Sequence, residues 1–163
     1  MAETTHRAAF NSPLETGVRA LAILSAVHPA SFDLERLVEM DYLVVHSGDV
    51  GGPESLHAPL PLRAGELLVR RNLIERGLML MVGRGLVARS PAPEGILYQA
   101  TEDAAPFLAS LATEYALMLK DRATWAAERF GAMTTAEIRQ MTSRFFERWS
   151  SQFQPLQGTG SVQ

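Results

Sequence analysis

Two histidines and an aspartate lie close together in a glycine-rich stretch of the chain, where their side chains could bind a metal ion. His46, Asp49 and His57 fall within twelve residues, and imidazole and carboxylate groups are common zinc ligands. Their spacing matches no helical HExxH pattern, however, and the other histidines, His6 and His28, are not their neighbours in sequence. We therefore expect backbone hydrogen bonds to satisfy these histidines, and we predict no metal site and no cofactor.

Other common signatures of catalysis are missing from the sequence. The absence of cysteine excludes a thiol nucleophile, thiolate zinc sites and disulfides. The loop glycines are not followed by Gly-Lys-Ser/Thr, as they would be in a phosphate-binding loop, and there is no G-x-S-x-G motif. A run of carboxylates (Asp33, Glu35, Glu39 and Asp41) is most simply a solvated helix face. We therefore predict that the protein is not an enzyme.

Opposite charges are segregated along the chain, although the net charge is only -3. Residues 31–57 contain six acidic residues and one arginine, a balance of -5, whereas residues 60–90 contain six arginines and two glutamates, a balance of +4. Lys120 is the only lysine among 15 basic residues, and the other 14 are arginines. Arginine is the basic side chain suited to bidentate and partly buried pairing. The segregation indicates either an internal salt-bridge seam between neighbouring helices or a polarised surface that binds a partner.

Capping signals divide most of the chain into helices. Ser12 with Glu15, and Thr134 with Glu137, have the spacing of capping boxes, and Asp33 is a further cap. The expected helices cover residues 13–27, 33–46, 64–83, 101–111, 113–130 and 134–153, with Thr101 as the cap of the fourth. Between the second and third helices, residues 47–61 form a long irregular loop, and such loops inside a compact domain are often functional.

A β-hairpin is predicted after the third helix, because the apolar segments 86–89 and 96–99 flank a five-residue turn. Three helices followed by a hairpin give the order of a winged helix-turn-helix. The expected fold is therefore mainly α with a small β-hairpin. We expect residues 1–10 to be a flexible arm, 11–100 the winged-helix-like core, 101–153 a C-terminal helical extension of the same domain, and 154–163 a disordered tail.

The expected third helix lacks the pattern of a helix that reads DNA. At 100° per residue, its core face holds Leu67, Ile74, Leu78 and Met81. The opposite face holds Val69, Leu73, Arg76, Met79 and Leu80. That face is mostly apolar where a DNA-reading helix would be polar, so we expect cover by the C-terminal helices or by another protein. Arg70 and Arg71 lie at the margins of the core face, and we expect at least one of them to pair with a buried carboxylate.

Four blocks of sequence together resemble a known protein family. They are FNSPLETG at 10–17, DYLVVHSGD at 41–49, GPESLH at 52–57 and RAGELLVRR at 63–71. In these blocks the chain resembles the middle component 2 family of bacterial ABC-three-component conflict systems, and the resemblance extends over residues 10–150. It implies a small winged-helix-type protein encoded between an SMC-like ABC ATPase and a third component, in a system that acts in defence against phage or plasmids.

This resemblance implies a non-catalytic adaptor that links the ATPase to the third component, and it supplies no catalytic residues. We predict that residues 41–71 and the hairpin form the partner surface. The residues expected there are His46, Asp49, His57, Arg63, Glu66, Arg70 and Arg71. An intramolecular role stays open for them, because Asp49 or Glu66 could pair with Arg70 or Arg71.

The alternative function is a winged-helix transcriptional regulator that forms a homodimer through residues 113–153. Arg63 and Arg89 would then contact DNA, and the near-neutral net charge favours indirect or non-specific contact. No apolar run approaches the roughly 20 residues that span a bilayer. We therefore expect a cytoplasmic protein without a membrane segment or a cleaved leader.

Overall fold

The computed structural model describes residues 12–57 and 63–153, with side chains for 12–57 and 69–144. Its elements are α2 (Pro13–Val27), β1 (Phe32–Asp33), α3 (Leu34–Val45), the 3-10 helix η1 (Ser47–Val50), α4 (Arg63–Gly83), β2 (Val87–Ala92), β3 (Gly95–Ala100), α5 (Ala104–Ser110), α6 (Glu114–Phe130) and α7 (Thr135–Phe153). The predicted arm and tail, and residues 58–61 of the predicted loop, lie outside the described residues. None of the described helices combines the length and the apolar character needed to cross a membrane.

The helix starts confirm the capping signals in the sequence. The Ser12 side chain accepts a hydrogen bond at the start of α2 (3.2 Å), Asp33 does so at the start of α3 (2.8 Å) and Thr113 does so at the start of α6 (3.1 Å). At the start of α7, Thr134 and Glu137 exchange hydrogen bonds of 2.9 and 3.1 Å, which is a complete capping box. Local chemistry therefore sets where these helices begin.

Thr101 does not cap α5. Its hydroxyl donates to the carbonyl oxygen of Gly85 (2.7 Å), and α5 begins after Asp103, which makes no side-chain capping bond. The hydroxyl thus joins the end of the hairpin to the turn that follows α4.

The hairpin has a shorter turn than the sequence predicts. Strand β2 continues through Ala92, which pairs with Gly95, so the turn is only residues 93–94. Pro91 is tolerated within β2 because this strand is the outer one and pairs only with β3 in the described sheet. The three-stranded antiparallel sheet has the order β1-β3-β2, in which Phe32 of β1 is opposite Tyr98 of β3.

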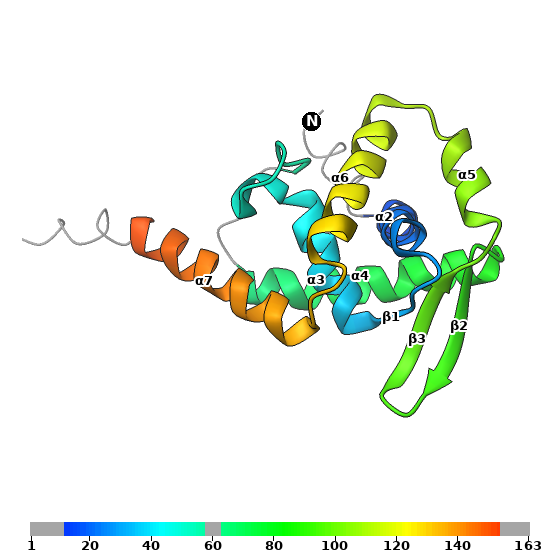
Figure 1. Cartoon of the computed structure of the whole chain (residues 1–163), viewed down its shortest axis with the longest axis horizontal. Coiled ribbons are helices and arrows are strands. Elements are labelled where there is room, and N and C mark those ends of the chain that lie inside the picture. Colours follow the sequence, from blue (N-terminus) through cyan, green and yellow to red (C-terminus); the bar gives the residue numbers. More distant parts are fainter. Residues whose placement is uncertain (1–11, 58–62, 154–163) are drawn as a thin grey trace, which may run out of the picture.

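Helix α2 is the centre of the described core. It contacts α3, α4, α5 and α6 and appears nearly end-on among them, while the hairpin extends below (Figure 1). Leu21, Ile23 and Leu24 on α2 have no exposed surface, and neither do Ile74 and Leu78 on α4. Helix α7 begins against α3 and then extends away from the other helices (Figure 1).

Two glycines allow α2 and α4 to cross with their backbones in contact. A Cβ atom on Gly77 would lie 2.5 Å from the backbone nitrogen of Gly17, and a Cβ atom on Gly17 would lie 2.7 Å from the carbonyl oxygen of Gly77. Both obstacles are backbone atoms, so no side-chain rotation can relieve the overlap. A larger residue at either position must push the helices apart.

Replacing Gly77 by Ala is therefore expected to destabilise the fold. We expect the free energy of unfolding to fall by about 1–3 kcal/mol, the usual cost of overpacking a well-packed contact. Gly83→Ala is the matched control, because a Cβ atom there would meet nothing within 4 Å. Urea denaturation of both variants measures the difference, and equal stabilities would contradict the close crossing.

Candidate functional site

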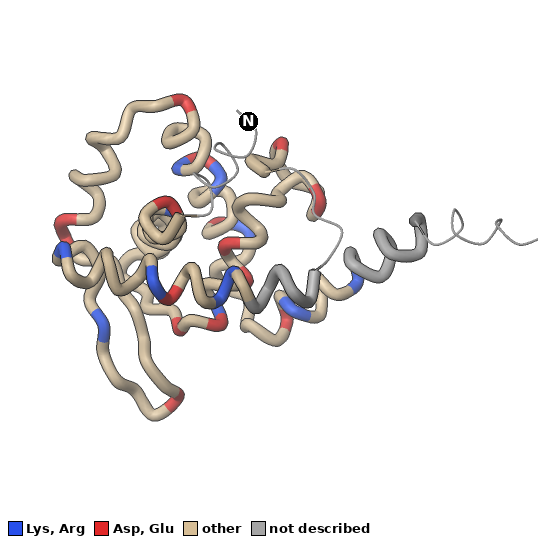
Figure 2. The backbone as a smooth tube through the Cα atoms, turned by 180° about the vertical axis from the view of Figure 1, so that it is seen from behind, with Lys and Arg blue, Asp and Glu red and all other residues tan. Residues whose placement is uncertain are grey.

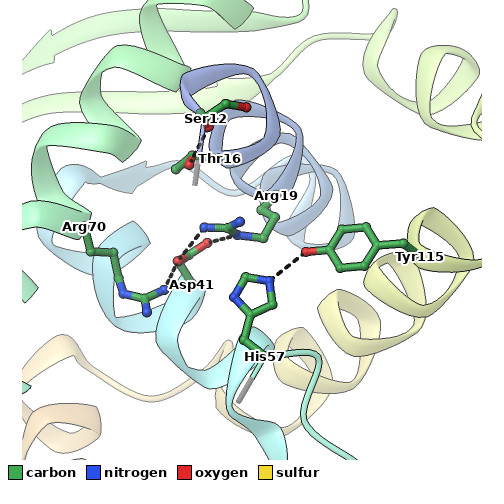
Figure 3. Close-up of polar contacts among 7 residues, drawn as sticks. All are labelled: Ser12, Thr16, Arg19, Asp41, His57, Arg70 and Tyr115. Carbon is green, nitrogen blue, oxygen red and sulfur yellow. Dashed lines mark hydrogen bonds and ion pairs between the residues drawn. The ribbon is translucent and has the colours of Figure 1, made fainter. Parts of the chain in front are cut away.

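A buried carboxylate joins three helices. Asp41 of α3 is 1% exposed and lies between Arg19 of α2 and Arg70 of α4 (Figure 3). Arg19 donates from Nε to one carboxylate oxygen at 2.8 Å and from Nη2 to the other at 3.4 Å. Arg70 donates from Nη1 to the second oxygen. We call these three residues the Asp41 clamp.

The electrostatics of the Asp41 clamp depend on having both arginines. Burial alone would raise the pKa of Asp41, but the adjacent Arg19 and Arg70 guanidinium groups hold it well below its usual range. Burial lowers the pKa of Arg19, and the Asp41 carboxylate more than reverses this, so its pKa is raised. Asp41 and Arg19 therefore stay charged, and removing one partner would leave a buried charge without compensation.

Two predicted site histidines lie beside the clamp. His57 Nε2 shares a 3.0 Å hydrogen bond with the hydroxyl of Tyr115 on α6 (Figure 3), so its ring has a side-chain partner and not only the backbone partners predicted. Burial and the nearby Arg19 charge lower the pKa of His57 to about 4, and burial raises the pKa of Tyr115. His46 is 2% exposed, and its ring centroid lies 6.5 Å from that of His57. The buried His46 and the half-buried His57 thus extend the polar cluster beyond the clamp.

Asp49 reaches the same region through an aromatic ring. Its carboxylate accepts a 3.4 Å hydrogen bond from the hydroxyl of Tyr42. The Tyr42 ring lies 4.9 Å from the His46 ring and carries the Arg70 guanidinium over its face at 5.9 Å. Tyr42 thus connects the predicted residues Asp49, His46 and Arg70.

Residues 47–57 of the predicted loop are tied down at both sides. The backbone nitrogens of Leu56 and His57 both donate to the carbonyl oxygen of Val45, at 3.0 and 3.1 Å. On the other side, Arg122 of α6 donates from Nε to the carbonyl oxygen of Glu54 at 2.9 Å. This part of the loop is therefore ordered, and hydrogen bonds join it to the end of α3 and to α6.

An internal salt-bridge seam accounts for part of the charge segregation. Besides the Asp41 clamp, Arg71 of α4 lies 3.9 Å from Glu35 of α3. Arg139 of α7 pairs with Glu35 at 3.3 Å and with Glu39 at 3.1 Å. The prediction that the α3 carboxylates form a solvated face is wrong for Glu39 and Asp41, which are 8% and 1% exposed, because each has an arginine partner from another helix.

The structure thus brings together some of the predicted site residues and separates others. Arg70 belongs to the Asp41 clamp, and His46, Asp49 and His57 lie around it. Arg71 is exposed beside Glu35, and Arg89 is exposed on the hairpin. The side chains of Arg63 and Glu66 lie outside the described residues. The expectation that Arg70 or Arg71 pairs with a buried carboxylate is confirmed for Arg70, with Asp41 as its partner.

Three residues of this region were missed by reasoning from the sequence. Arg19 interrupts an apolar stretch, and none of the expectations from the sequence gives it a partner. Asp41 stands among apolar residues of α3, and Tyr115 carries no local signal. An isolated charge inside an apolar run is the one signal that points to a buried ion pair, and it applies to both Arg19 and Asp41.

The arrangement is suited to holding the fold together and is closed to a substrate. Asp41, Arg19 and His46 are each at most 2% exposed, so a substrate could reach them only after the helices separate. Within the described residues, no three His, Cys, Asp or Glu side chains are grouped so that they could hold a metal ion. The observed chemistry is that of a charged and hydrogen-bonded core.

The structure tests one of the two covers predicted for the outer face of α4, which were the C-terminal helices or another protein. Ile74, Leu78 and Met81 are fully buried on the core face, as predicted. On the opposite face, Met79 and Leu80 are 48% and 41% exposed, so the described C-terminal helices do not cover it. In the view from behind in Figure 2, α4 lies toward the viewer, and no other described element covers it.

The fold and the buried cluster define a small, mainly helical protein whose polar core is structural. Comparison with known families gives a match to ABC-three component (ABC-3C) system Middle Component 2 over residues 9–152. The chain therefore belongs to this family, which confirms the resemblance carried by the four sequence blocks. Neither the curated proteins nor the solved structures gave a match.

Asp41→Asn is expected to destabilise the protein strongly, because it leaves two buried guanidinium groups without a counter-charge. We expect a loss of about 3–5 kcal/mol in the free energy of unfolding. Asp121→Asn makes the same change at an exposed carboxylate, since Asp121 is 68% exposed and lies 2.7 Å from Arg122, and it should cost about 0.5 kcal/mol or less. Denaturant titration of both variants tests this, and similar losses would contradict the structural role of the clamp.

His57 should make stability fall as the solution becomes acidic. Its pKa of about 4 in the folded protein is below its unfolded value of 6.5, so between these values the unfolded state binds more protons. Stability contributed by neutral His57 is present above pH 6.5 and is lost as the pH falls toward 4. In His57→Gln, the loss between pH 6.5 and 4.5 should be smaller by about 1–2 kcal/mol.

The matched control for this measurement is His28→Gln, because His28 is exposed. Its unfolding free energy should follow the pH dependence of the unmodified protein. If His57→Gln and His28→Gln gave the same pH dependence, His57 would not be held in its neutral form by the fold.

Proposed function

We propose that the protein is a non-catalytic adaptor, the middle component that links an SMC-like ABC ATPase to the third component of a bacterial anti-phage or anti-plasmid defence system. The observation that carries the proposal is the family match over residues 9–152, since a middle component of a three-component system implies partners within that system. The closed polar core supports a role in binding and offers no accessible reactive group.

A winged-helix core is part of this proposal. The order α2-β1-α3-α4-β2-β3, with β1 pairing beside β3 in the sheet β1-β3-β2, is the order of helices and strands expected for a winged helix-turn-helix. The β2–β3 hairpin would be the wing. Helices α5, α6 and α7 would form the C-terminal extension.

The partner surface in this proposal comprises residues 41–71 and the hairpin. Arg71 is its exposed charged anchor, because its side chain is 46% exposed and its contact with Glu35 is long. Arg70 and the loop residues His46, Asp49 and His57 support the surface from inside through their contacts around the Asp41 clamp.

The DNA-binding regulator receives less support. Its recognition helix would be α4, whose exposed face carries the apolar side chains of Val69, Met79 and Leu80. Its dimerisation element would include α6, yet Leu119, Ala123 and other α6 residues are buried within this chain. A salt-dependent shift of duplex DNA at physiological ionic strength would favour this alternative.

Co-purification tests the adaptor proposal. We expect the full chain to retain both the ATPase and the third component encoded beside it, and Arg71→Glu to weaken retention of the ATPase at least several-fold. Arg129→Glu on α6 is a control that makes the same exchange at another exposed arginine. If the unmodified chain retained neither protein, the adaptor proposal would be wrong.

A further inference from the structure

The outer face of α4 carries a continuous apolar strip centred on an arginine. Val69 lies seven residues before Arg76, and Met79 and Leu80 lie three and four residues after Arg76. All four residues therefore share one helix face. The three apolar side chains are 60%, 48% and 41% exposed. We call these four residues the α4 strip.

The exposed apolar side chains of the α4 strip are clustered, unlike the other exposed apolar side chains of the described residues. Single exposed apolar residues are normal on soluble proteins, whereas a contiguous group marks an interaction site. Of the six large apolar residues exposed in the described chain, three belong to the strip, while Leu14, Ile96 and Leu117 lie on three other elements. The exposure follows from the fold, because the opposite face of α4 is occupied by the crossing with α2.

Positive charge surrounds the strip. Arg71 and Arg76 are exposed on α4, and Arg84 is exposed directly after its last residue. The guanidinium group of Arg89 on β2 approaches the Met79 sulfur at 4.0 Å. Within the described residues, no carboxylate lies in ion-pair distance of Arg76 or Arg84. Figure 2 shows these positive positions along α4 with few acidic ones between them. A partner that covers the strip must therefore supply negative charge as well as apolar surface.

We propose that the α4 strip docks an acidic amphipathic helix of a partner protein from the same three-component system. Apolar side chains of that helix would pack on Val69, Met79 and Leu80, and its carboxylates would pair with Arg76 and the arginines beside it. This proposal rests on the adaptor function and names the surface and the chemistry of one partner. The strip residues are spaced i, i+7, i+10 and i+11, which is one face of a helix, and a partner helix can pack along such a face.

A protein partner fits the strip better than DNA does. Phosphate binding would use the arginines but would place three exposed apolar side chains against a charged, hydrated backbone. Base recognition requires several donors and acceptors on the reading face, whereas the middle of the strip offers Arg76 alone. A helix with mixed apolar and acidic side chains satisfies both features at once.

Substitutions in the strip test the proposal with the purified ATPase and the purified third component as probes. Leu80→Glu and Arg76→Glu should each weaken binding of one of these proteins tenfold or more, and added salt should weaken that binding in the unmodified chain. Leu117→Glu is the matched control, because Leu117 is 55% exposed on α6, and it should bind as the unmodified chain does. All three positions are exposed, and circular dichroism verifies that each variant is folded.

The outcomes separate this proposal from the adaptor function. If the unmodified chain bound neither protein, the adaptor function itself would fail. If it bound but Leu80→Glu and Arg76→Glu bound equally well, the docking proposal alone would be overturned. It would also be overturned if these variants only converted a dimer of this chain to a monomer, or only abolished binding of duplex DNA.

Discussion

The pairing of one buried carboxylate with two arginines is the constraint on which the described structure depends. Asp41 is almost fully removed from water, so it must keep both partners to stay charged at acceptable cost. Because Arg19 comes from α2 and Arg70 from α4, this requirement fixes three helices relative to one another. The contacts of His57 with Tyr115 extend the same constraint to the loop and to α6.

A second, apolar constraint acts on the same pair of helices. The backbones of α2 and α4 touch at Gly17 and Gly77, so the close approach of the two helices depends on the absence of side chains there as well as on the ion pairs. Helix α4 therefore has one face committed to the core and cannot rotate to bury the other. The outer face of α4 therefore suits the proposed adaptor function, because a rigid and uncovered helix face loses little conformational entropy when a partner binds.

Local features could be predicted from the sequence, and the tertiary pairing could not. Helix starts at Ser12, Asp33 and Thr134 followed from capping chemistry that acts over three residues. The partner of Arg70 lies 29 residues away, and an isolated charge in an apolar run indicates that Asp41 is buried without showing which arginine pairs with it. The same limit applies to α4, whose apolar outer face was expected to be covered by the C-terminal helices or by another protein. Periodicity shows which residues share a face of a helix, but it does not identify what lies against that face.

Native-state hydrogen exchange of the isolated protein tests the central claim most directly, that α2, α3 and α4 are fixed as one unit. Amides of the buried turns of α2, of α3 and of residues 70–82 in α4 can be followed separately under increasing denaturant. The account predicts that all three groups exchange through one opening with the same free energy, equal to that of global unfolding. If α4 opened at a clearly lower free energy while α2 and α3 stayed protected, the Asp41 clamp would not be what holds these helices together.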